Sequence, residues 1–409
     1  MNILWGFFGI LVIFAIAFLF STNRKAISWR PILGGLAIQL VFAFIVLKWE
    51  AGKAGLQRLT LAVTEITNYA NEGVQFLFGG LYIKESGISF VFAFQVLTVI
   101  IFFSSLISVL YYLRIMQAII KVIGGALSWM LGTSKAESMS AAANIFVGQT
   151  EAPLVVRPYI ATMTKSELFA VMTGGLASVA GSVLIGYSLL GVPLEYLLAA
   201  SFMAAPAGLV MAKLFVPETE EAESAPGSRL EFKMDDDTES VNVIDAAARG
   251  ASVGLTLALN VGAMLLAFIA LIALVNGILG AIGSLFNYPG LSLQQILGFI
   301  FAPLAFAVGV PWEEAVKAGS FIGQKLVLNE FVAYSDFAPQ IQNLSPKTVA
   351  IVSFALCGFA NLSSMAILLG GLGGLAPDRR QDIARMGLRS VAAGMLASLL
   401  SAAIAGMLL

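Results

Sequence analysis

The sequence predicts an all-α polytopic membrane protein with about eight transmembrane helices plus two re-entrant helical hairpins in an inverted repeat. Three observations support this prediction. Apolar residues make up 59% of the 409 residues and charged residues only 11%, against roughly 45–50% and about 25% in soluble domains. Most charge-free stretches have the length of one bilayer crossing, about 20 residues. Two further stretches are polar at their centres, where a crossing helix would be apolar.

The composition excludes several kinds of chemistry. The chain has no histidine, which removes His-based acid–base catalysis and His-ligated zinc or haem. Cys357 is its one cysteine, so neither an internal disulfide nor a thiolate metal cluster is possible. The net charge of −1 offers no bulk attraction for nucleic acid. None of the seven aspartates lies in the centre of a predicted crossing, which argues against an intramembrane aspartyl protease. We therefore expect no enzyme.

The predicted crossings follow the charge-free stretches. These are 1–23, 31–47, 86–113, 168–194, 196–212, 250–312, 348–377 and 390–409. The first has no positive n-region and no small-residue cleavage site, so we interpret it as a membrane span and not a signal peptide. The stretch 250–312 is too long for one span and breaks at the turn sequence Asn-Tyr-Pro-Gly, 287–290. Between the second and third crossings, 51–69 has the pattern of an amphipathic surface helix.

The basic residues predict the orientation. Arg24, Lys25 and Arg30 follow the first crossing, whereas no basic residue precedes it. Short loops rich in Lys and Arg stay in the cytoplasm. With eight crossings, the N-terminus and the C-terminus are both predicted to be extracytoplasmic.

One segment resembles a soluble linker. Residues 217–240 hold nine of the 24 acidic residues. Blocks of like charge are typical of solvated, flexible segments. We interpret 215–249 as an acidic cytoplasmic linker, with a calcium site as the alternative.

The first polar-centred stretch, 135–165, predicts a re-entrant hairpin. Each half is about a dozen residues long, too short to cross a bilayer. We expect Gly148 to end the first half-helix, Thr150 to cap the second, and Pro153 to lie in its first turn. The exposed backbone at such a tip is tolerated only within protein or at a water-filled cavity.

The second polar-centred stretch, 291–323, predicts another hairpin. Its first half-helix would end at Gly309, and Pro311 would open the second, with Glu313 and Glu314 near the positive end of the helix dipole. The order hairpin, span, span then occurs twice, as in the inverted repeats of secondary transporters. The predicted domains are 1–134, mainly scaffold; 135–214, the first repeat; 215–249, the acidic linker; 250–290, a central scaffold span; and 291–409, the second repeat.

Several polar residues lie inside the predicted membrane region. Ionisable groups there cost about 2.5–3.5 kcal/mol each and are functional by default. For Glu151 the alternative is a carboxylate that satisfies local amides, and for Glu330 it is a buried ion pair with Lys325. For Asn361 and Ser364 the alternative is hydrogen bonding between helices.

Three motifs carry a resemblance to a known family. They are Gly-Gln-Thr-Glu-Ala-Pro-Leu at 148–154, Gly-Gln-Lys-Leu-Val-Leu-Asn-Glu-Phe-Val-Ala-Tyr at 323–334, and Cys-Gly-Phe-Ala-Asn-Leu-Ser-Ser at 357–364. Over nearly its whole length the chain resembles the short bacterial form of the concentrative nucleoside transporters. The resemblance implies a homotrimer in the lipid bilayer of the bacterial inner membrane. It also implies symport of a nucleoside such as uridine into the cytoplasm with either Na⁺ or a proton, by an elevator-type movement and without a cofactor.

The resemblance also assigns substrate contacts. By position in the motifs these are Gln149, Thr150, Glu151 and Val183 on the base, Glu330, Asn361 and Ser364 on the ribose, and Phe359 lining the same pocket. A nucleoside is neutral and rich in hydrogen-bonding groups, which suits carboxylates, amides and hydroxyls. A site built to pair a hydroxyl rejects analogues that lack it.

The resemblance places Na⁺ at four residues of the first repeat. Asn144 and Ser178 would supply side-chain oxygens, and Val147 and Val179 backbone carbonyls. Neutral oxygens suit Na⁺ and bind no proton near neutral pH. Asn144 and Ser178 acting only as hydrogen-bonding links between helices is one alternative. The alternative functions are a proton-coupled nucleoside symporter and, more remotely, a channel or an intramembrane enzyme.

Overall fold

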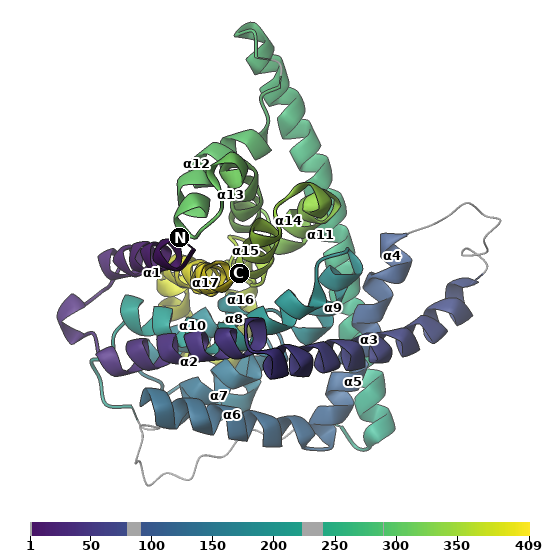
Figure 1. Ribbon diagram of the computed structural model, residues 1–409. Coiled ribbons are helices and arrows are strands. Elements are labelled where there is room, and N and C mark those ends of the chain that lie inside the picture. The colour runs from purple at the N-terminus through teal and green to yellow at the C-terminus, as the bar shows by residue number, and fades with distance from the viewer. Residues whose placement is uncertain (1, 80–90, 223–239, 289) are drawn as a thin grey trace.

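The computed structural model describes residues 2–79, 91–222, 240–288 and 290–409, and within them every regular element is a helix (Figure 1). The helices are α1 (Asn2–Leu19), η1 (Arg24–Ala26), α2 (Trp29–Leu47), α3 (Glu50–Phe78), α4 (Phe92–Gln95), α5 (Leu97–Tyr112), α6 (Ile115–Leu131), α7 (Lys135–Ala143), η4 (Ala152–Tyr159), α8 (Lys165–Ala177), α9 (Gly181–Leu189), α10 (Leu194–Phe215), α11 (Val243–Leu285), α12 (Leu293–Ala307), α13 (Trp312–Val327), α14 (Glu330–Phe337), η5 (Ala338–Asn343), α15 (Pro346–Leu356), α16 (Ser364–Leu375), η6 (Pro377–Arg379) and α17 (Arg380–Leu408).

The all-helical membrane fold predicted from the sequence is confirmed. In the described residues, six helical segments are long and apolar enough to cross a membrane, or seven if α12 and α13 count as one bent span. The six match six of the eight predicted crossings. The other two predicted crossings correspond to α1 and to the broken pair α15–α16. Both are apolar, but their helices are shorter than the six: α1 has 18 residues, and α15 and α16 have 11 and 12.

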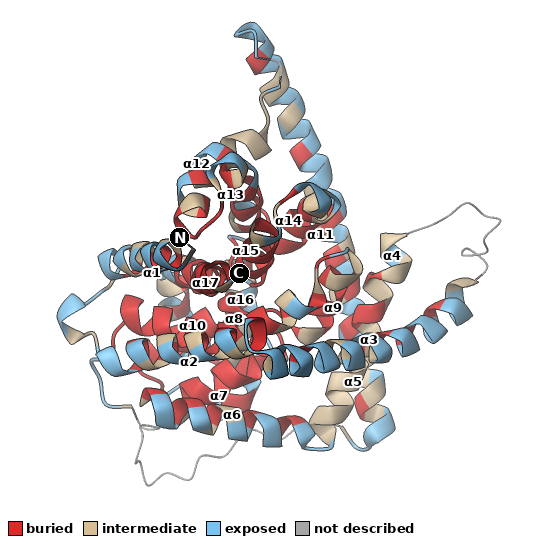
Figure 2. Ribbon diagram, in the orientation of Figure 1, coloured by how far each residue is buried: buried red, intermediate tan, exposed pale blue. Residues whose placement is uncertain are grey.

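Burial divides the helices into an inner and an outer group (Figure 2). In the most apolar windows of α8–α9, α10 and α17, 94%, 89% and 89% of the residues are buried, but in α11 only 11% are. Figure 1 shows α11 running along one side of the molecule, beside α5 and α14. Because apolar surface must lie in lipid or against protein, α11 presents most of its surface to the surroundings of the chain.

Helix α11 moves one predicted boundary, the one between the acidic linker and the central span. Asn242 caps it by accepting a hydrogen bond from the Asp245 N–H (2.9 Å), so the linker predicted to reach residue 249 ends at 242. The helix begins at Val243, before the predicted start of the central span at residue 250. At 1.5 Å per residue its 43 residues are about 65 Å long. The turn predicted at 287–290 follows it, with Asn287 at φ 56°. Pro289 and residues 223–239 of the linker lie outside the described residues.

The order of helices in the second half repeats that of the first. The run α6, α7, η4, α8, α9, α10 recurs as α12, α13, α14, α15, α16, α17. Gly132 joins α6 to α7 at φ 71°, and Gly309 joins α12 to α13 at φ 110°, each two residues before a helix N-cap. The pair α12–α13, predicted as the second hairpin, is bent by 116°. In the repeat, however, it is the counterpart of α6–α7, and the counterpart of the first hairpin is α13–α14.

Candidate functional site

The first turn at the site joins α7 to η4. The Gly148 carbonyl closes it by accepting hydrogen bonds from the N–H groups of Glu151 (3.1 Å) and Ala152 (3.0 Å). The Glu151 carboxylate accepts in return from the Gly148 N–H (3.3 Å), so it does satisfy a local amide. Two predicted details are wrong. Gly148 does not end a helix, because α7 already ends at Ala143 and Gly148 closes the turn that follows. The residue at the N-cap of η4 is Glu151 and not Thr150.

The second turn at the site joins α13 to α14. Asn329 caps α14, its side-chain oxygen accepting from the Val332 N–H at 2.9 Å. Glu330 is therefore the first residue of α14, and it is buried. Asparagine is a strong N-cap residue, so the sequence did carry a signal for this turn. The second hairpin was instead predicted at the preceding bend, because Gly309 and Pro311 are the more conspicuous turn signal.

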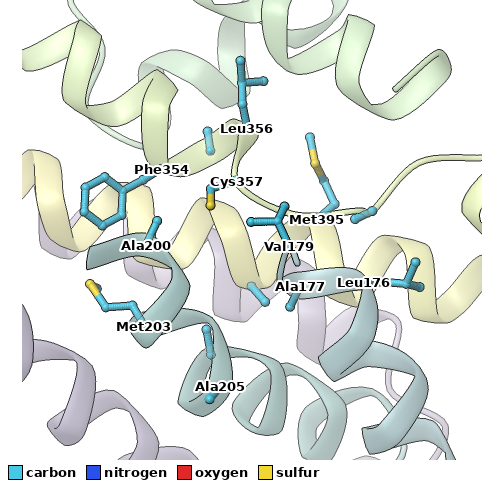
Figure 3. Packing of buried hydrophobic residues seen from close by; sticks show 14 of the residues in the cluster. Leu176, Ala177, Val179, Ala200, Met203, Ala205, Phe354, Leu356, Cys357 and Met395 are labelled. Atoms are coloured by element: carbon cyan, nitrogen blue, oxygen red, sulfur yellow. The ribbon is translucent and has the colours of Figure 1, made fainter. Parts of the chain in front are cut away.

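Two broken helices cross at the site. Residues 178–180 separate α8 from α9, and residues 357–363 separate α15 from α16. The Phe359 N–H donates to the Ser178 carbonyl at 3.1 Å. A Cβ on Gly358 would lie only 2.9 Å from the Ala177 carbonyl oxygen, so the close approach of the two backbones requires glycine. Figure 3 shows the apolar side chains that pack around this crossing.

Each break is also bonded to the hairpin of its own repeat. The Gly181 N–H donates to the Phe146 carbonyl (2.9 Å), and the Leu362 N–H donates to the Leu326 carbonyl (3.1 Å). Helix ends leave N–H and C=O groups without partners, and these bonds satisfy some of them. The hairpin turns and the breaks are thereby held together as one unit.

Glu330 is at the centre of a buried hydrogen-bond network. Its two carboxylate oxygens accept from the Tyr187 hydroxyl (3.1 Å) and from the Asn361 side-chain amide (2.9 Å). The amide oxygen of Asn361 accepts in turn from the Ser363 hydroxyl (2.7 Å) and the Ser364 N–H (2.9 Å). The network fixes the orientation of Asn361 at the start of α16.

The network reaches the first hairpin through Gln149. The Gln149 amide nitrogen lies 3.5 Å from the Ser364 hydroxyl, at the limit of a hydrogen bond. Its amide oxygen is buried and has no hydrogen-bond partner among the described residues. A buried acceptor without a partner is costly, so this oxygen is available to a ligand.

The network borders a cavity of about 130 Å³. The structure brings all eight residues predicted to contact substrate to its lining: Gln149, Thr150, Glu151, Val183, Glu330, Phe359, Asn361 and Ser364. Leu257, Val261, Met264 and Leu265 of α11 form an apolar wall.

Sequence reasoning missed Tyr187 and the α11 wall. Tyr187 follows Val183 by four residues, so the two lie on one face of α9, and that spacing was the available signal. The wall residues carry no local signal, because α11 is apolar over most of its length.

A second, larger cavity adjoins the first. Its volume is about 330 Å³, and Glu151 and Ala180 line both. Tyr111 of α5, Arg157 of η4 and Arg249 of α11 also line it. It therefore extends from the site toward the end of α11 that receives the acidic linker.

Asn144 and Ser178, the predicted Na⁺ ligands, lie at the ends of α7 and α8. The Asn144 amide nitrogen donates to the Ser140 carbonyl (3.0 Å), while its side-chain oxygen is buried without a partner in the described part of the chain. A Cβ on Gly174 would lie 3.2 Å from that nitrogen, so the two helix ends are adjacent. The Ser178 hydroxyl donates to the Gly174 carbonyl at 2.9 Å. A buried, unpaired amide oxygen fits a cation ligand.

Lys325 has other partners than the ion pair considered from the sequence. Its ammonium donates to the Ala355 carbonyl (2.8 Å) and the Ser398 hydroxyl (3.1 Å). Glu330 takes its hydrogen bonds from Tyr187 and Asn361 instead.

Three family models match the chain. The model described as Na⁺ dependent nucleoside transporter C-terminus matches residues 196–406, the corresponding N-terminus model matches 8–81, and a model described as nucleoside recognition matches 93–193.

Full-length relatives are similar as well. The transporter YutK of Bacillus subtilis is 62% identical, with 100% of both chains covered. The nucleoside permease NupC of Helicobacter pylori is 50% identical, over 99% of this chain and 97% of that one.

Solved structures of CNTnw share the fold. The inward-facing substrate-bound structure has a TM-score of 0.94 at 56% identity, covering 100% of this chain and 98% of that one. A doubly substituted variant of CNTnw was solved in an outward-facing state and has the same TM-score.

Proposed function

The chain belongs to the concentrative nucleoside transporter family, and we propose that it is a Na⁺-coupled symporter that carries nucleosides such as uridine into the cytoplasm by an elevator-type movement. It is a multi-pass membrane protein that transports nucleosides by alternating access, and it is not an enzyme.

The observation that carries the proposal is the buried network of Glu330, Asn361 and Ser364 beside the cavity. Ribose hydroxyls are both donors and acceptors. A carboxylate accepts strongly from such hydroxyls, because hydrogen bonds to an ionised group contribute about 1.5–3 kcal/mol. In our proposal Glu330 binds the ribose, with Asn361 and Ser364 beside it.

The first hairpin would recognise the base. The unpartnered amide oxygen of Gln149 suits an N–H donor on a nucleobase, and Thr150 and Glu151 line the same cavity. Val183 and the apolar wall of α11 offer surface for the face of the base. A nucleoside would thus contact both hairpin turns at once.

Sodium would bind at the end of α7, next to this turn. In our proposal the ligands are the Asn144 and Ser178 side chains and the Val147 and Val179 carbonyls. Asn144 and Val147 lie five and two residues before Gln149 in the chain. The Phe146 carbonyl accepts a hydrogen bond from the Gly181 N–H at the first break. Because the ion and the base share one turn, an ion that orders the turn would favour the binding of the nucleoside, which couples the two.

The larger cavity gives the proposed exit. It extends toward the linker end of α11, the end that the distribution of basic residues places in the cytoplasm. Glu151 lines both cavities and would be the last hairpin group that the nucleoside contacts. We propose that both termini are extracytoplasmic, as the same rule predicts, and that the chain lies in the bacterial inner membrane, as the family resemblance implies.

The buried unit of hairpins and broken helices would be the moving part. It is bonded internally at both breaks and packs around α10 and α17, whereas α11 is mostly exposed. Movement of this unit against α11 would carry the site across the membrane. The outer surface of α11 suits the interface of a homotrimer.

Uptake of radiolabelled uridine into proteoliposomes tests this function. We expect uphill uptake with an inward Na⁺ gradient and its loss when choline replaces Na⁺ at fixed pH. Full uptake in sodium-free buffer driven by an inward proton gradient would favour the proton-coupled alternative. Flux that never exceeds equilibration would point to a channel.

A further inference from the structure

Lys325 is a fully buried lysine near the end of α13. A charged side chain in the membrane interior costs several kcal/mol and marks a functional position by default. Lys325 lies five residues before Glu330, yet it lines neither cavity described above. Its ammonium group is directed at the second helix break.

The ammonium binds one carbonyl at the end of α15 and a hydroxyl that itself donates to a carbonyl of that break. It donates directly to the Ala355 carbonyl in the last turn of α15. It also donates to the Ser398 hydroxyl, which lies 3.3 Å from the Cys357 carbonyl. The last carbonyls of a helix lack partners within the helix and carry partial negative charge. A buried cation is therefore well placed at this helix end.

The helix cannot satisfy the Ala355 carbonyl by continuing. Its helical partner would be the N–H of Phe359, four residues on. That N–H donates instead to the Ser178 carbonyl of the first break. The crossing of the two breaks thus leaves the Ala355 carbonyl open, and Lys325 binds it.

At the first break, a serine hydroxyl and not a lysine pairs the equivalent carbonyl. Thr164 caps α8 and Ser345 caps α15, so positions in the two helices can be matched by counting from these caps. Gly174 and Ala355 each lie ten residues after the cap (174 − 164 and 355 − 345). The hydroxyl that satisfies the Gly174 carbonyl belongs to Ser178, fourteen residues after the cap.

The residue fourteen positions after Ser345 is Phe359, which has no hydroxyl. The match between the repeats holds elsewhere, because Gly181 and Leu362, each seventeen residues after the cap, make the same bond to their own hairpins. In the second repeat an ammonium thus replaces the hydroxyl of the first.

We propose that Lys325 is a positioning residue, a built-in cation that fixes the second helix break in its binding geometry without a coupling ion. Asn361 and Ser364 follow this break directly and line the cavity. The inference rests on the proposed ribose contacts of these two residues. It assigns ion dependence to the first break alone, where, among the described residues, the Asn144 side-chain oxygen has no hydrogen-bond partner and no lysine is bonded.

Three variants test the proposal in proteoliposomes. Lys325→Met keeps an unbranched apolar chain but removes the ammonium, Lys325→Ala removes both, and Lys317→Ala changes an exposed lysine of the same helix. We expect the uridine KM to rise at least tenfold in both Lys325 variants, with the Na⁺ concentration for half-maximal uptake within threefold of wild type. Methylammonium should lower the KM of Lys325→Ala, because it can supply the missing cation. Lys317→Ala should behave as wild type.

A wild-type KM in Lys325→Met would show that the residue only fills space and would overturn the proposal. A methylammonium effect equal in Lys325→Ala and Lys317→Ala would overturn it too. If the Lys325 variants do not fold, Ser398→Ala tests the proposal instead, with Ser401→Ala as its control. The Ser398 variant should raise the uridine KM about threefold without changing the Na⁺ requirement, and an unchanged KM would refute the inference. Failure of the wild type to take up uridine with Na⁺ would instead refute the proposed function.

Discussion

Glu330 illustrates how single side chains build this site. A buried carboxylate is stable only when hydrogen bonds compensate its lost hydration, and here Tyr187 and Asn361 supply them. Glu330 also lines the cavity, so in the proposed function a ribose hydroxyl would join a network that already holds the carboxylate in place. Such preorganisation lowers the cost of ordering the site when a ligand binds.

Removing the charge of Glu330 should weaken the binding of the sugar. Glu330→Gln keeps the shape, but a hydrogen bond to a charged acceptor contributes about 1.5–3 kcal/mol, so we expect the uridine KM to rise roughly tenfold to a hundredfold. Uracil, which lacks ribose, should compete poorly in the wild type. Glu313→Gln, at an exposed position of α13, is the control. Equal competition by uracil and uridine would contradict the ribose assignment.

Asn144 should determine the sodium requirement. Asn144→Ala removes the buried oxygen that lacks a partner, and we expect a higher Na⁺ concentration for half-maximal uridine uptake. At saturating Na⁺ the uridine KM should return toward wild type. Asn343→Ala, at an exposed asparagine, serves as control. An unchanged Na⁺ dependence would remove Asn144 from the ion site.

At the scale of elements, the crossing of two broken helices is the feature on which the site depends. Each break exposes backbone groups that a continuous helix would have paired, and the two breaks pair some of them with each other and with the hairpins. Unwound backbone in a membrane is tolerated only inside protein or at a water-filled cavity. Residues 178–180 of the first break and Cys357, Gly358 and Ala360 of the second are accordingly buried, whereas Leu362, near the end of the second break, is 49% exposed. Figure 2 shows that the helices around the crossing are mostly buried.

A methyl group at Gly358 should separate the two breaks. Its Cβ would lie 2.7 Å from the Ser398 hydroxyl and 2.9 Å from the Ala177 carbonyl. Overpacking of this kind costs about 1–3 kcal/mol. We expect Gly358→Ala to lower the melting temperature of the purified protein and to abolish most uridine uptake. Gly370→Ala, where a Cβ would meet nothing within 4 Å, should change neither. A fully active Gly358→Ala would show that the close approach is dispensable.

On the scale of the whole molecule, the proposed symport of Na⁺ with a nucleoside implies transport of net charge. One Na⁺ entering with a neutral nucleoside moves one positive charge. A membrane potential contributes about 2.3 kcal/mol per charge at 100 mV, and a tenfold Na⁺ gradient adds about 1.4 kcal/mol. Together they could sustain a nucleoside gradient of several hundredfold.

Uridine uptake should therefore respond to voltage. An inside-negative potassium diffusion potential, set with valinomycin, should speed Na⁺-driven uptake and raise the final accumulation. The same potential without Na⁺ should have no effect. Uptake that depends on Na⁺ but not on voltage would show that the movement of another charge cancels that of the Na⁺.

The sequence by itself determined the membrane class and six of the crossings, and its resemblance to a known family pointed to eight of the residues that line the cavity. Hydropathy and charge are local properties of the chain, and the motifs at 148–154, 323–334 and 357–364 are contiguous. The tertiary structure alone decided which turn of the second half faces the site, because the Gly309 and Asn329 signals are equally local. It also decided that Tyr187 holds Glu330 and that Lys325 binds the second break. These contacts join residues 30 to 143 positions apart, and no periodicity or spacing in the chain specifies which distant groups meet.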